Sequence, residues 1–388
     1  LNLILKKLER SGNEFLVKDI LRILLIQKKH QDIVGNVIKS IGIKKEDAKK
    51  VQDMIRKLKN IPDVYTKNND AVVYYKSLSP ACRHCVKDLG CTLRSTVQCN
   101  RNCFFCFADN LPIIKKIQPD ITTLKLKINK RIKEVEFKSF AISGGEPFLY
   151  PEVVFKLLQY INKKFNNKIY TRVYTNGDLI NENILIELNR LGLNEIRYSI
   201  KPLEKPNVSL LKLTKKYIPK ILIEMPVLPA SEKFMINLIY KLDKIGINGI
   251  NLLELFFNGY HINDFKKRKY KIDLDLKEIR EVYDTKPVYE YPIHGSKLLC
   301  LKLIEYFATN KAKLFINFCS QKTKQLQYNE KNKRIAIKNK PAYSKITNKN
   351  THEILAIYSN IENAKNKILS RGKKDFYLRE NQDKIKRL

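Results

Sequence analysis

The chain has 388 residues, 44% of them hydrophobic, which is enough for one large domain with additions or for two domains. Lys and Arg number 75 against 39 Asp and Glu, giving a formal net charge of +36. No stretch approaches the roughly 20 apolar residues of a membrane span, which excludes a helical membrane protein. The first residues turn charged within a few positions and show no small-residue cleavage site, so we expect a cytoplasmic protein without a signal peptide.

The excess of positive charge has two explanations. A field of this size attracts polyanions such as RNA, DNA or acidic protein faces. A chain rich in Lys, Asn and Ile and free of Trp is also what an AT-rich genome encodes without selection for a partner. Both interpretations stay open, and residues 322–388, where Lys and Arg are denser, are a candidate docking face.

Two amphipathic stretches near the N-terminus predict helices. In the first, the apolar residues at helical spacing are Leu16, Ile20, Leu21, Leu24 and Leu25. The second covers residues 46–61. We therefore expect residues 1–78 to form a helical N-terminal extension, either a cap or interaction module or a nucleic-acid-binding helical domain.

From residue 92 onward, short β-rich runs alternate with helical stretches. The predicted strands cover residues 92–99, 138–145, 169–176, 195–201, 221–228 and 249–255. The later strands start about 25–30 residues apart, which is the length of a βα unit. Each run is continuously apolar, as in a parallel sheet that is buried on both faces. Six units predict an α/β fold, a partial (β/α)6 barrel, whose chemistry lies at the C-terminal ends of the strands.

This pattern divides the chain into four parts. Residues 1–78 are the helical extension, residues 79–98 a cysteine-containing lead-in with the first strand, residues 92–290 the barrel, and residues 291–388 a basic C-terminal extension. Within the last part, the apolar stretch around Cys300 predicts a helix whose thiol packs in the core. Residues 351–369 predict one more strand and helix.

The strongest chemical motif is a loop of three cysteines. Six of the eight cysteines lie between Cys82 and Cys106, and such crowding in a reducing compartment indicates metal or redox chemistry. Cys99, Cys103 and Cys106 have the spacing C-x3-C-x2-C and directly follow the first predicted strand. Three thiolates can bind three irons of a cubane cluster and leave the fourth iron open to a small molecule. Zinc patterns normally supply four ligands in paired groups.

A second motif, GGEP, ends the next predicted strand. Gly144 and Gly145 let the backbone approach a ligand closely, Glu146 adds a carboxylate, and Pro147 fixes the following turn. A carboxylate and bare backbone carbonyls are suitable partners for an ammonium group. Alone, this motif is also typical of an ordinary strand-to-helix turn.

Over residues 92–260 the sequence resembles the radical S-adenosylmethionine (SAM) superfamily, whose two diagnostic motifs are these two. The resemblance implies the partial barrel and a [4Fe–4S] cluster whose open iron is chelated by the amino and carboxylate groups of SAM. It also implies reductive cleavage of SAM to methionine and a 5′-deoxyadenosyl radical, which abstracts hydrogen from a substrate. The regions 82–106, 289–297 and 318–324 are similar to a branch related to pyruvate formate-lyase activating enzymes.

The resemblance assigns roles to residues of this chain. Cys99, Cys103 and Cys106 match the cluster ligands, and Phe105 matches an aromatic residue near the SAM adenine. Gly144, Gly145 and Glu146 match the groups that bind the methionine amino group. Contacts to the ribose or carboxylate of SAM are expected from Thr175, Asn176, Ser199 and Glu224. For Thr175-Asn176-Gly177 a plain turn explains the residues equally well.

An upstream cysteine group allows several interpretations. Cys82 and Cys85 form a C-x2-C pair, Cys91 follows, and Cys319 lies far along the chain. An auxiliary iron–sulfur cluster could use Cys82, Cys85 and some of Cys91 or Cys319. A zinc site with His84 as a ligand, or free thiols, are the alternatives.

Three functions compete at this stage. The first is a radical SAM enzyme of oxidoreductase or transferase type that acts on a macromolecule, protein or RNA, with an electron donor of the flavodoxin or ferredoxin type. The second is an iron–sulfur protein that binds nucleic acid or senses redox state. The third, a structural zinc protein, leaves the GGEP motif unexplained.

Overall fold

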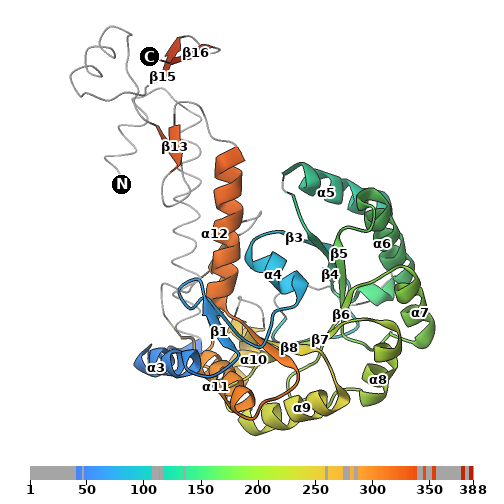
Figure 1. Ribbon diagram of the computed structural model, residues 1–388, viewed down its shortest axis with the longest axis vertical. Helices are drawn as coiled ribbons and strands as arrows, with labels where there is room; N and C mark the ends of the chain where they lie inside the picture. The colour runs from blue at the N-terminus through green and yellow to red at the C-terminus, as the bar shows by residue number, and fades with distance from the viewer. Residues whose placement is uncertain are drawn as a thin grey trace.

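The computed structural model contains one strongly curved sheet with helices along its outer side (Figure 1). The structure describes residues 41–45, 48–106, 113, 117–134, 136–257, 261–273, 280–283, 287–338, 344–346, 352–354, 377–380 and 384–387. In this part of the chain no helix is long and apolar enough to cross a bilayer. The expected helix around Leu16–Leu25 and most of the element expected over 351–369 lie outside the described residues.

The sheet has nine strands in the order β1-β2-β12-β8-β7-β6-β5-β4-β3. Seven of them run parallel: β3 (Gly90–Thr96), β4 (Ser139–Gly144), β5 (Tyr170–Thr175), β6 (Glu195–Ser199), β7 (Ile221–Val227), β8 (Gly249–Glu254) and β12 (Phe315–Cys319). Two antiparallel strands, β2 (Val72–Tyr75) and β1 (Val64–Lys67), extend the sheet beyond β12. The edges are β1 and β3, so the sheet does not close into a full barrel.

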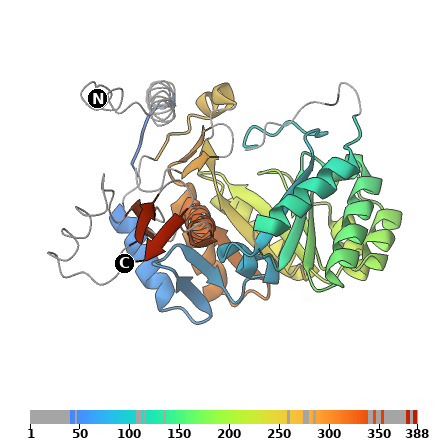
Figure 2. The ribbon, with the colours of Figure 1, turned by 90° about the horizontal axis from the view of Figure 1, so that it is seen from above.

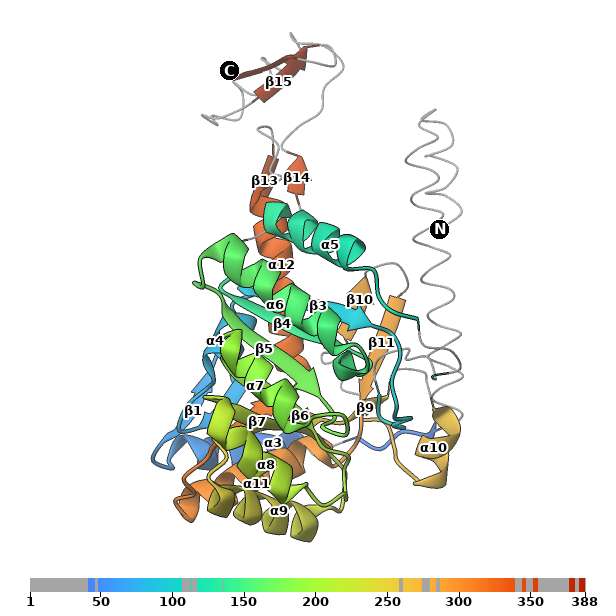
Figure 3. The same cartoon turned by 90° about the vertical axis from the view of Figure 1, so that its right-hand side faces the viewer.

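Amphipathic helices cover the convex face of the sheet (Figure 3). They are α5 (Ile121–Glu134), α6 (Pro151–Phe165), α7 (Glu182–Arg190), α8 (Val208–Tyr217), α9 (Glu232–Ile245) and α11 (Ser296–Thr309). Helix α6 shows why they form: Pro151 occupies its first turn, apolar residues recur at helical spacing on its buried face, and Asn166 ends it in the left-handed conformation.

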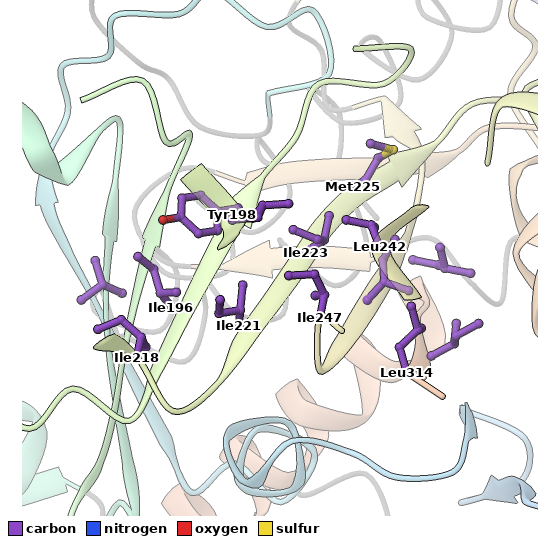
Figure 4. Close-up of a cluster of buried hydrophobic side chains, with 14 of the residues drawn as sticks. Ile196, Tyr198, Ile218, Ile221, Ile223, Met225, Leu242, Ile247 and Leu314 are labelled. Atoms are coloured by element: carbon purple, nitrogen blue, oxygen red, sulfur yellow. The ribbon is translucent and has the colours of Figure 1, made fainter. Parts of the chain in front are cut away.

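The main core lies between the sheet and this helical layer. Figure 4 shows Ile196 of β6, Ile221 and Ile223 of β7 and Leu242 of α9 as members of one buried cluster. Fully burying one such side chain contributes about 1.5–3 kcal/mol. The core therefore fixes the strands from the outside and leaves their concave face for other contacts.

The concave face carries polar side chains and is covered by a short helix, α4 (Pro80–Val86) (Figure 1). Ser79 caps α4 by accepting a hydrogen bond from the Cys82 amide. Helix α4 packs against β3, β4 and β5 and against α12 (Gln321–Lys338). Helix α4 thus occupies part of the space on the concave side of the half-barrel that the curved sheet forms.

The remaining elements are short or lie at the ends. They are α3 (Ala48–Lys59), η1 (Pro147–Leu149), α10 (Ile262–Lys267) and the three-stranded sheet of β9 (Phe256–Phe257), β11 (Pro287–Pro292) and β10 (Arg280–Tyr283). Two hairpins follow: β13 (Ser344–Ile346) with β14 (His352–Ile354), and β15 (Tyr377–Glu380) with β16 (Lys384–Arg387).

The six predicted strands of the partial barrel are confirmed, and two expectations about its flanks need correction. A wholly helical region over 1–78 is wrong, because β1 and β2 belong to the large sheet, where all four residues of Val72–Tyr75 are buried. The boundary at residue 290 cuts through β11, and the region beyond it contributes β12 to the parallel sheet. The helix around Cys300 is confirmed as α11.

Candidate active site at the cysteine loop

The two glycines after β4 fit against the backbone that leads into the cysteine loop. The Gly145 amide donates to the Thr96 carbonyl at 2.9 Å, and the Glu146 amide donates to the Gln98 carbonyl at 2.8 Å. A Cβ on Gly145 would lie 1.9 Å from the Gln98 oxygen, and one on Gly144 would lie 2.4 Å from the Thr96 oxygen. Gly144 also has a φ of +148°. The two glycines thus let the turn after β4 pack closely against the backbone of the cysteine loop. From the sequence, we had expected them to let the backbone approach a ligand.

Glu146 is fully buried and accepts three hydrogen bonds from the protein. Its Oε1 accepts from the Phe148 amide at 3.1 Å and from the Thr175 hydroxyl at 2.8 Å, and its Oε2 accepts from the Asn176 amide at 2.7 Å. Burial raises the pKa of this carboxyl to about 6, against the hydrogen bonds that lower it. A carboxylate can accept about four hydrogen bonds, so most of the acceptor positions of Glu146 are already used within the protein. These hydrogen bonds connect the turn after β4 to the turn after β5.

The three thiols of the loop lie near one another and near this turn. A Cβ on Gly145 would stand 3.0 Å from the Cys99 amide nitrogen, so Cys99 adjoins the glycine turn. Burial, with a smaller contribution from the neighbouring Cys106 and Cys99, raises the pKa of Cys103 to about 11, although Lys201 acts in the opposite direction. Cys99 likewise has its pKa raised by burial, with Glu146 and Cys106 adding to the effect.

This donor set fits an iron–sulfur cluster. Thiols kept protonated by burial and mutual repulsion become thiolates when iron binds them, and a cubane takes each thiolate on a different iron. Among the described residues, no three His, Cys, Asp or Glu side chains are placed so that they could hold one metal ion. Cys99, Cys103 and Cys106 remain the predicted ligands of a cluster.

The aromatic residues between the second and third cysteines anchor the loop to α10. Phe104 contacts Phe265 of α10 edge-on, with ring centroids 5.6 Å apart, and the Arg268 guanidinium lies 3.9 Å above the Phe104 ring. Phe105 is partly buried beside Phe104, at 5.3 Å. Figure 2 shows α10 on the same side of the molecule as this loop. Phe104 is an anchor that sequence reasoning missed.

Residues 93–267 match the sequence profile of the radical SAM superfamily. This part of the chain is a radical SAM domain. A radical SAM domain thus spans β3 to α10 and contains both the cysteine loop and the glycine turn.

Relatives and solved structures show partial similarity to this chain. A Methanocaldococcus jannaschii protein named as a candidate glycyl-radical enzyme activating enzyme is 28% identical over 63% of this chain and 64% of its own length. An uncharacterised protein of that organism is 31% identical over 29% of this chain and 38% of its own length. The chain therefore spans less than two thirds of the length of these curated relatives.

Among solved structures, Streptococcus suis SuiB bound to its precursor peptide matches with a TM-score of 0.43 and 20% identity over 70% of this chain and 60% of that one. A variant of spore photoproduct lyase matches with a TM-score of 0.41 and 12% identity over 60% of this chain and 75% of that one.

The structure distributes the other expected SAM contacts unevenly. Thr175 and Asn176 lie beside the glycine turn and the cysteine loop, but their side chains bond within the protein. Thr175 bonds to Glu146 and the Gly177 amide, and Asn176 bonds to Asn100 and the Asp178 amide. Ser199 is exposed at the end of β6. These three remain predicted contacts, with Ser199 the most accessible of them.

Glu224 lies on the concave face and is the direct register partner of Ser199 in the sheet. Its Oε1 accepts from the Asn251 amide at 2.7 Å and from the Arg197 guanidinium at 2.5 Å. The Glu224 carboxylate is therefore already hydrogen-bonded to two side chains on the concave face of the sheet. Its contact with SAM stays a prediction.

The upstream cysteines lie in two separate places. Cys82 and Cys85 on α4, and Cys319 at the end of β12, are close enough that the two α4 thiols contribute to the raised pKa of Cys319, whose first cause is burial. Cys91 packs in the main core with Leu93, a different hydrophobic cluster from that of Cys82. The concave-face group is thus Cys82, Cys85 and Cys319.

Proposed function

We propose that this protein is a radical SAM enzyme that reductively cleaves SAM at a [4Fe–4S] cluster to form a 5′-deoxyadenosyl radical. The observation that carries the proposal is the contact between the cysteine loop and the Gly144-Gly145-Glu146 turn. That contact lies at the C-terminal edge of the parallel sheet of a radical SAM domain. When bound, the cluster would supply the electron and the open iron site for this cleavage.

The protein's own residues have two tasks in this proposal. Cys99, Cys103 and Cys106 hold the cluster, and Ser199 and Phe105 provide accessible polar and aromatic surface for SAM. Glu146, Thr175 and Asn176 are bonded to one another, so they fix the shape of the site on which SAM binds. Rigid support of this kind is what a site needs to direct a reactive species to one hydrogen atom.

The substrate in this proposal is a protein. The M. jannaschii relative is named as an activating enzyme for a glycyl-radical enzyme, which is itself a protein. We expect the electron to come from a donor of the flavodoxin or ferredoxin type, in the cytoplasm. An RNA substrate is the alternative that the net charge of +36 supports.

Anaerobic reconstitution tests the proposal. The purified chain, loaded with iron and sulfide and given SAM and dithionite, should release 5′-deoxyadenosine. Cys103→Ala should abolish the release, whereas Cys300→Ala, which removes a core thiol of α11, should keep it. A fully loaded wild-type protein that forms no 5′-deoxyadenosine refutes the proposal. Tight, salt-dependent RNA binding without SAM cleavage would then favour an iron–sulfur protein that binds nucleic acid or senses redox state.

We also propose a second iron–sulfur centre at Cys82, Cys85 and Cys319. N–H donors surround its sulfur atoms: Arg197 Nη2 lies 3.2 Å from Cys82 Sγ, and Gln327 Nε2 lies 2.9 Å from Cys85 Sγ. Arg172, 3% exposed, also contacts Cys85, and its Nε and Nη1 have no hydrogen-bond partner. Buried cations and amide donors are the surroundings that an anionic cluster requires.

Iron analysis tests this second centre. Wild-type protein should bind about eight irons per chain if it holds two four-iron clusters. A Cys82→Ala/Cys85→Ala double variant should bind about half as many, and Cys91→Ala should match the wild type. Four irons in both the wild type and the double variant would refute it, and zinc retained through Cys82 and Cys85 would assign the group to zinc instead.

A further inference from the structure

The segment between the first two cysteines is bonded to a turn 77 residues away in sequence. Arg101 Nε donates to Asp178 Oδ2 at 2.7 Å, and Arg101 Nη2 donates to Asp178 Oδ1. The side-chain N–H₂ group of Asn100 donates to Asp178 Oδ2 at 2.9 Å. One carboxylate after β5 therefore binds two consecutive residues of the cysteine loop, and a planar, two-bond guanidinium contact fixes orientation as well as distance.

A third nitrogen of the Arg101 guanidinium also binds a carboxylate that follows a parallel strand. Its Nη1 donates to Glu204 Oε2, in the segment after β6, at 3.1 Å. The Arg101 side chain is only 14% exposed, whereas the side chains of Asp178 and Glu204 are 37% and 43% exposed, so the guanidinium is the shielded member of each pair. The loop between Cys99 and Cys103 is thus tied to the ends of two parallel strands.

The same turn also supports the glycine motif. Asn176 donates its amide N–H to Glu146 at 2.7 Å and its side-chain N–H to Asn100 at 2.7 Å, while its own oxygen accepts from the Asp178 amide at 3.0 Å. Residues 175–178 therefore contact Glu146 on one side and the cysteine loop on the other. Movement of this turn would displace both halves of the site together.

We propose that Asp178, acting through Arg101 and Asn100, is the positioning residue of the cluster-binding loop. It fixes the backbone between Cys99 and Cys103, and it joins that backbone through Asn176 to the Glu146 turn. The inference rests on the proposed function, because it concerns the same cluster. Nothing in the cysteine spacing or in the glycine motif requires an acidic residue here, so this role is additional to both.

The exposed pair Arg190–Glu187 provides a matched control. Arg190 Nε donates to Glu187 at 2.7 Å and Nη2 donates to the second oxygen at 2.5 Å, the same two-bond arrangement, on α7. Glu187→Gln removes the charge from this pair as Asp178→Asn removes it from the other. In Asp178→Asn, the new side-chain N–H₂ group would also face the N–H donors of Arg101 or Asn100, with which it cannot form a hydrogen bond.

The experiment measures iron loss from the reconstituted full chain to an excess of chelator. Asp178→Asn should lose iron about tenfold faster than the wild type, the usual effect of removing a group that orients a metal ligand. It should also raise the KM for SAM more than it lowers kcat. Asp178→Glu, which restores the carboxylate, should recover part of the retention, and Glu187→Gln should behave as the wild type.

The outcomes separate this inference from the proposed function. Wild-type retention of iron by Asp178→Asn, with SAM cleavage intact in both proteins, overturns the positioning role and leaves the proposed function standing. A wild type that takes up no iron overturns both. If Asp178→Asn and Glu187→Gln lose iron equally fast, the effect is general and the positioning role is again overturned.

Discussion

A glycine can be required for space or for backbone conformation, and the chain contains a clear example of each. Gly145 has no left-handed φ, but a side chain there would collide with the Gln98 carbonyl at 1.9 Å. Gly192 has a φ of +68° and nothing within 4 Å of an added Cβ. The requirement at Gly145 is steric and involves the cysteine loop, whereas the requirement at Gly192 is local.

Gly145→Ala should therefore lower both stability and cluster loading. Relief of the collision must push the Gln98–Cys99 backbone outward, which we expect to cost about 1–3 kcal/mol of unfolding free energy and to reduce iron uptake. Gly192→Ala should cost about 1–2 kcal/mol through the left-handed conformation alone and leave iron uptake unchanged. Denaturant unfolding and iron titration of both variants measure this, and equal iron uptake by the two would contradict it.

Glu146→Gln distinguishes a structural carboxylate from a ligand contact. A glutamine offers one oxygen and one N–H₂ group, so either the Thr175 and Phe148 donors or the Asn176 amide would face another donor. The unmet donor should lower the unfolding free energy by about 1–3 kcal/mol without any SAM present. Chemical denaturation of the metal-free protein is the measurement. Unchanged stability together with a raised KM for SAM would show that Glu146 serves the ligand alone.

At the scale of elements, β12 depends on a glycine in its neighbour. Gly249 of β8 pairs with Phe315 of β12, and a Cβ on Gly249 would lie 2.3 Å from the Phe315 ring. The Phe315 ring thus packs over Gly249. This contact lies where β12, the seventh parallel strand, pairs with β8, the last of the six predicted strands.

Gly249→Ala should destabilise the protein by about 1–3 kcal/mol through overpacking. Phe315→Leu in the same chain should recover part of the loss, because the smaller side chain leaves room for the methyl group. A double-mutant cycle on unfolding free energies measures the coupling, expected at about 0.5–3 kcal/mol. Strictly additive effects would mean that the two residues do not compete for the same space.

The elements that sequence reasoning predicted are those whose pattern is local. The six strands are continuous apolar runs, and the cysteine and glycine motifs are contiguous in sequence. Helix α12 was missed because few of its residues are apolar; it is held by distant contacts, such as Arg334 donating to the Asp88 carbonyl at 3.1 Å. Strands β1 and β2 were missed because each has only four residues, and because β2 joins the large sheet through β12, which lies more than 200 residues away. The Arg101–Asp178 contact likewise has no local pattern.

On the scale of the whole molecule, a polar network spans the concave face of the sheet. Arg197 of β6 donates to Glu195 at 2.5 Å, to Glu224 of β7 at 2.5 Å and to Ser79 at the start of α4 at 3.1 Å. Asn251 of β8 continues the network to Glu224. These bonds join α4 to three strands, β6, β7 and β8, on the face opposite the hydrophobic core.

Removal of the Arg197 side chain should therefore lower the unfolding free energy strongly. Arg197→Leu leaves the fully buried Glu195 carboxylate with less compensation, an effect of about 3–5 kcal/mol. Arg197→Leu/Glu195→Leu should be less destabilising than the sum of the two single changes, because no charge is then stranded. Arg190→Leu on the exposed face of α7 should stay within about 0.5 kcal/mol of the wild type. Urea unfolding at neutral pH measures all four variants.

The same network gives the protein a defined sensitivity to acid. Burial alone would raise the pKa of Glu195, but Arg197 and Arg172 outweigh burial and lower it. A carboxyl with a lowered pKa stabilises the fold above its unfolded value of about 4.3, and the stabilisation disappears as pH falls through the lower folded value. Unfolding free energy should thus fall below about pH 4 in the wild type, and the fall should be shallower in the double variant. Identical acid profiles would show that the charges across the half-barrel contribute nothing net to holding α4 in place.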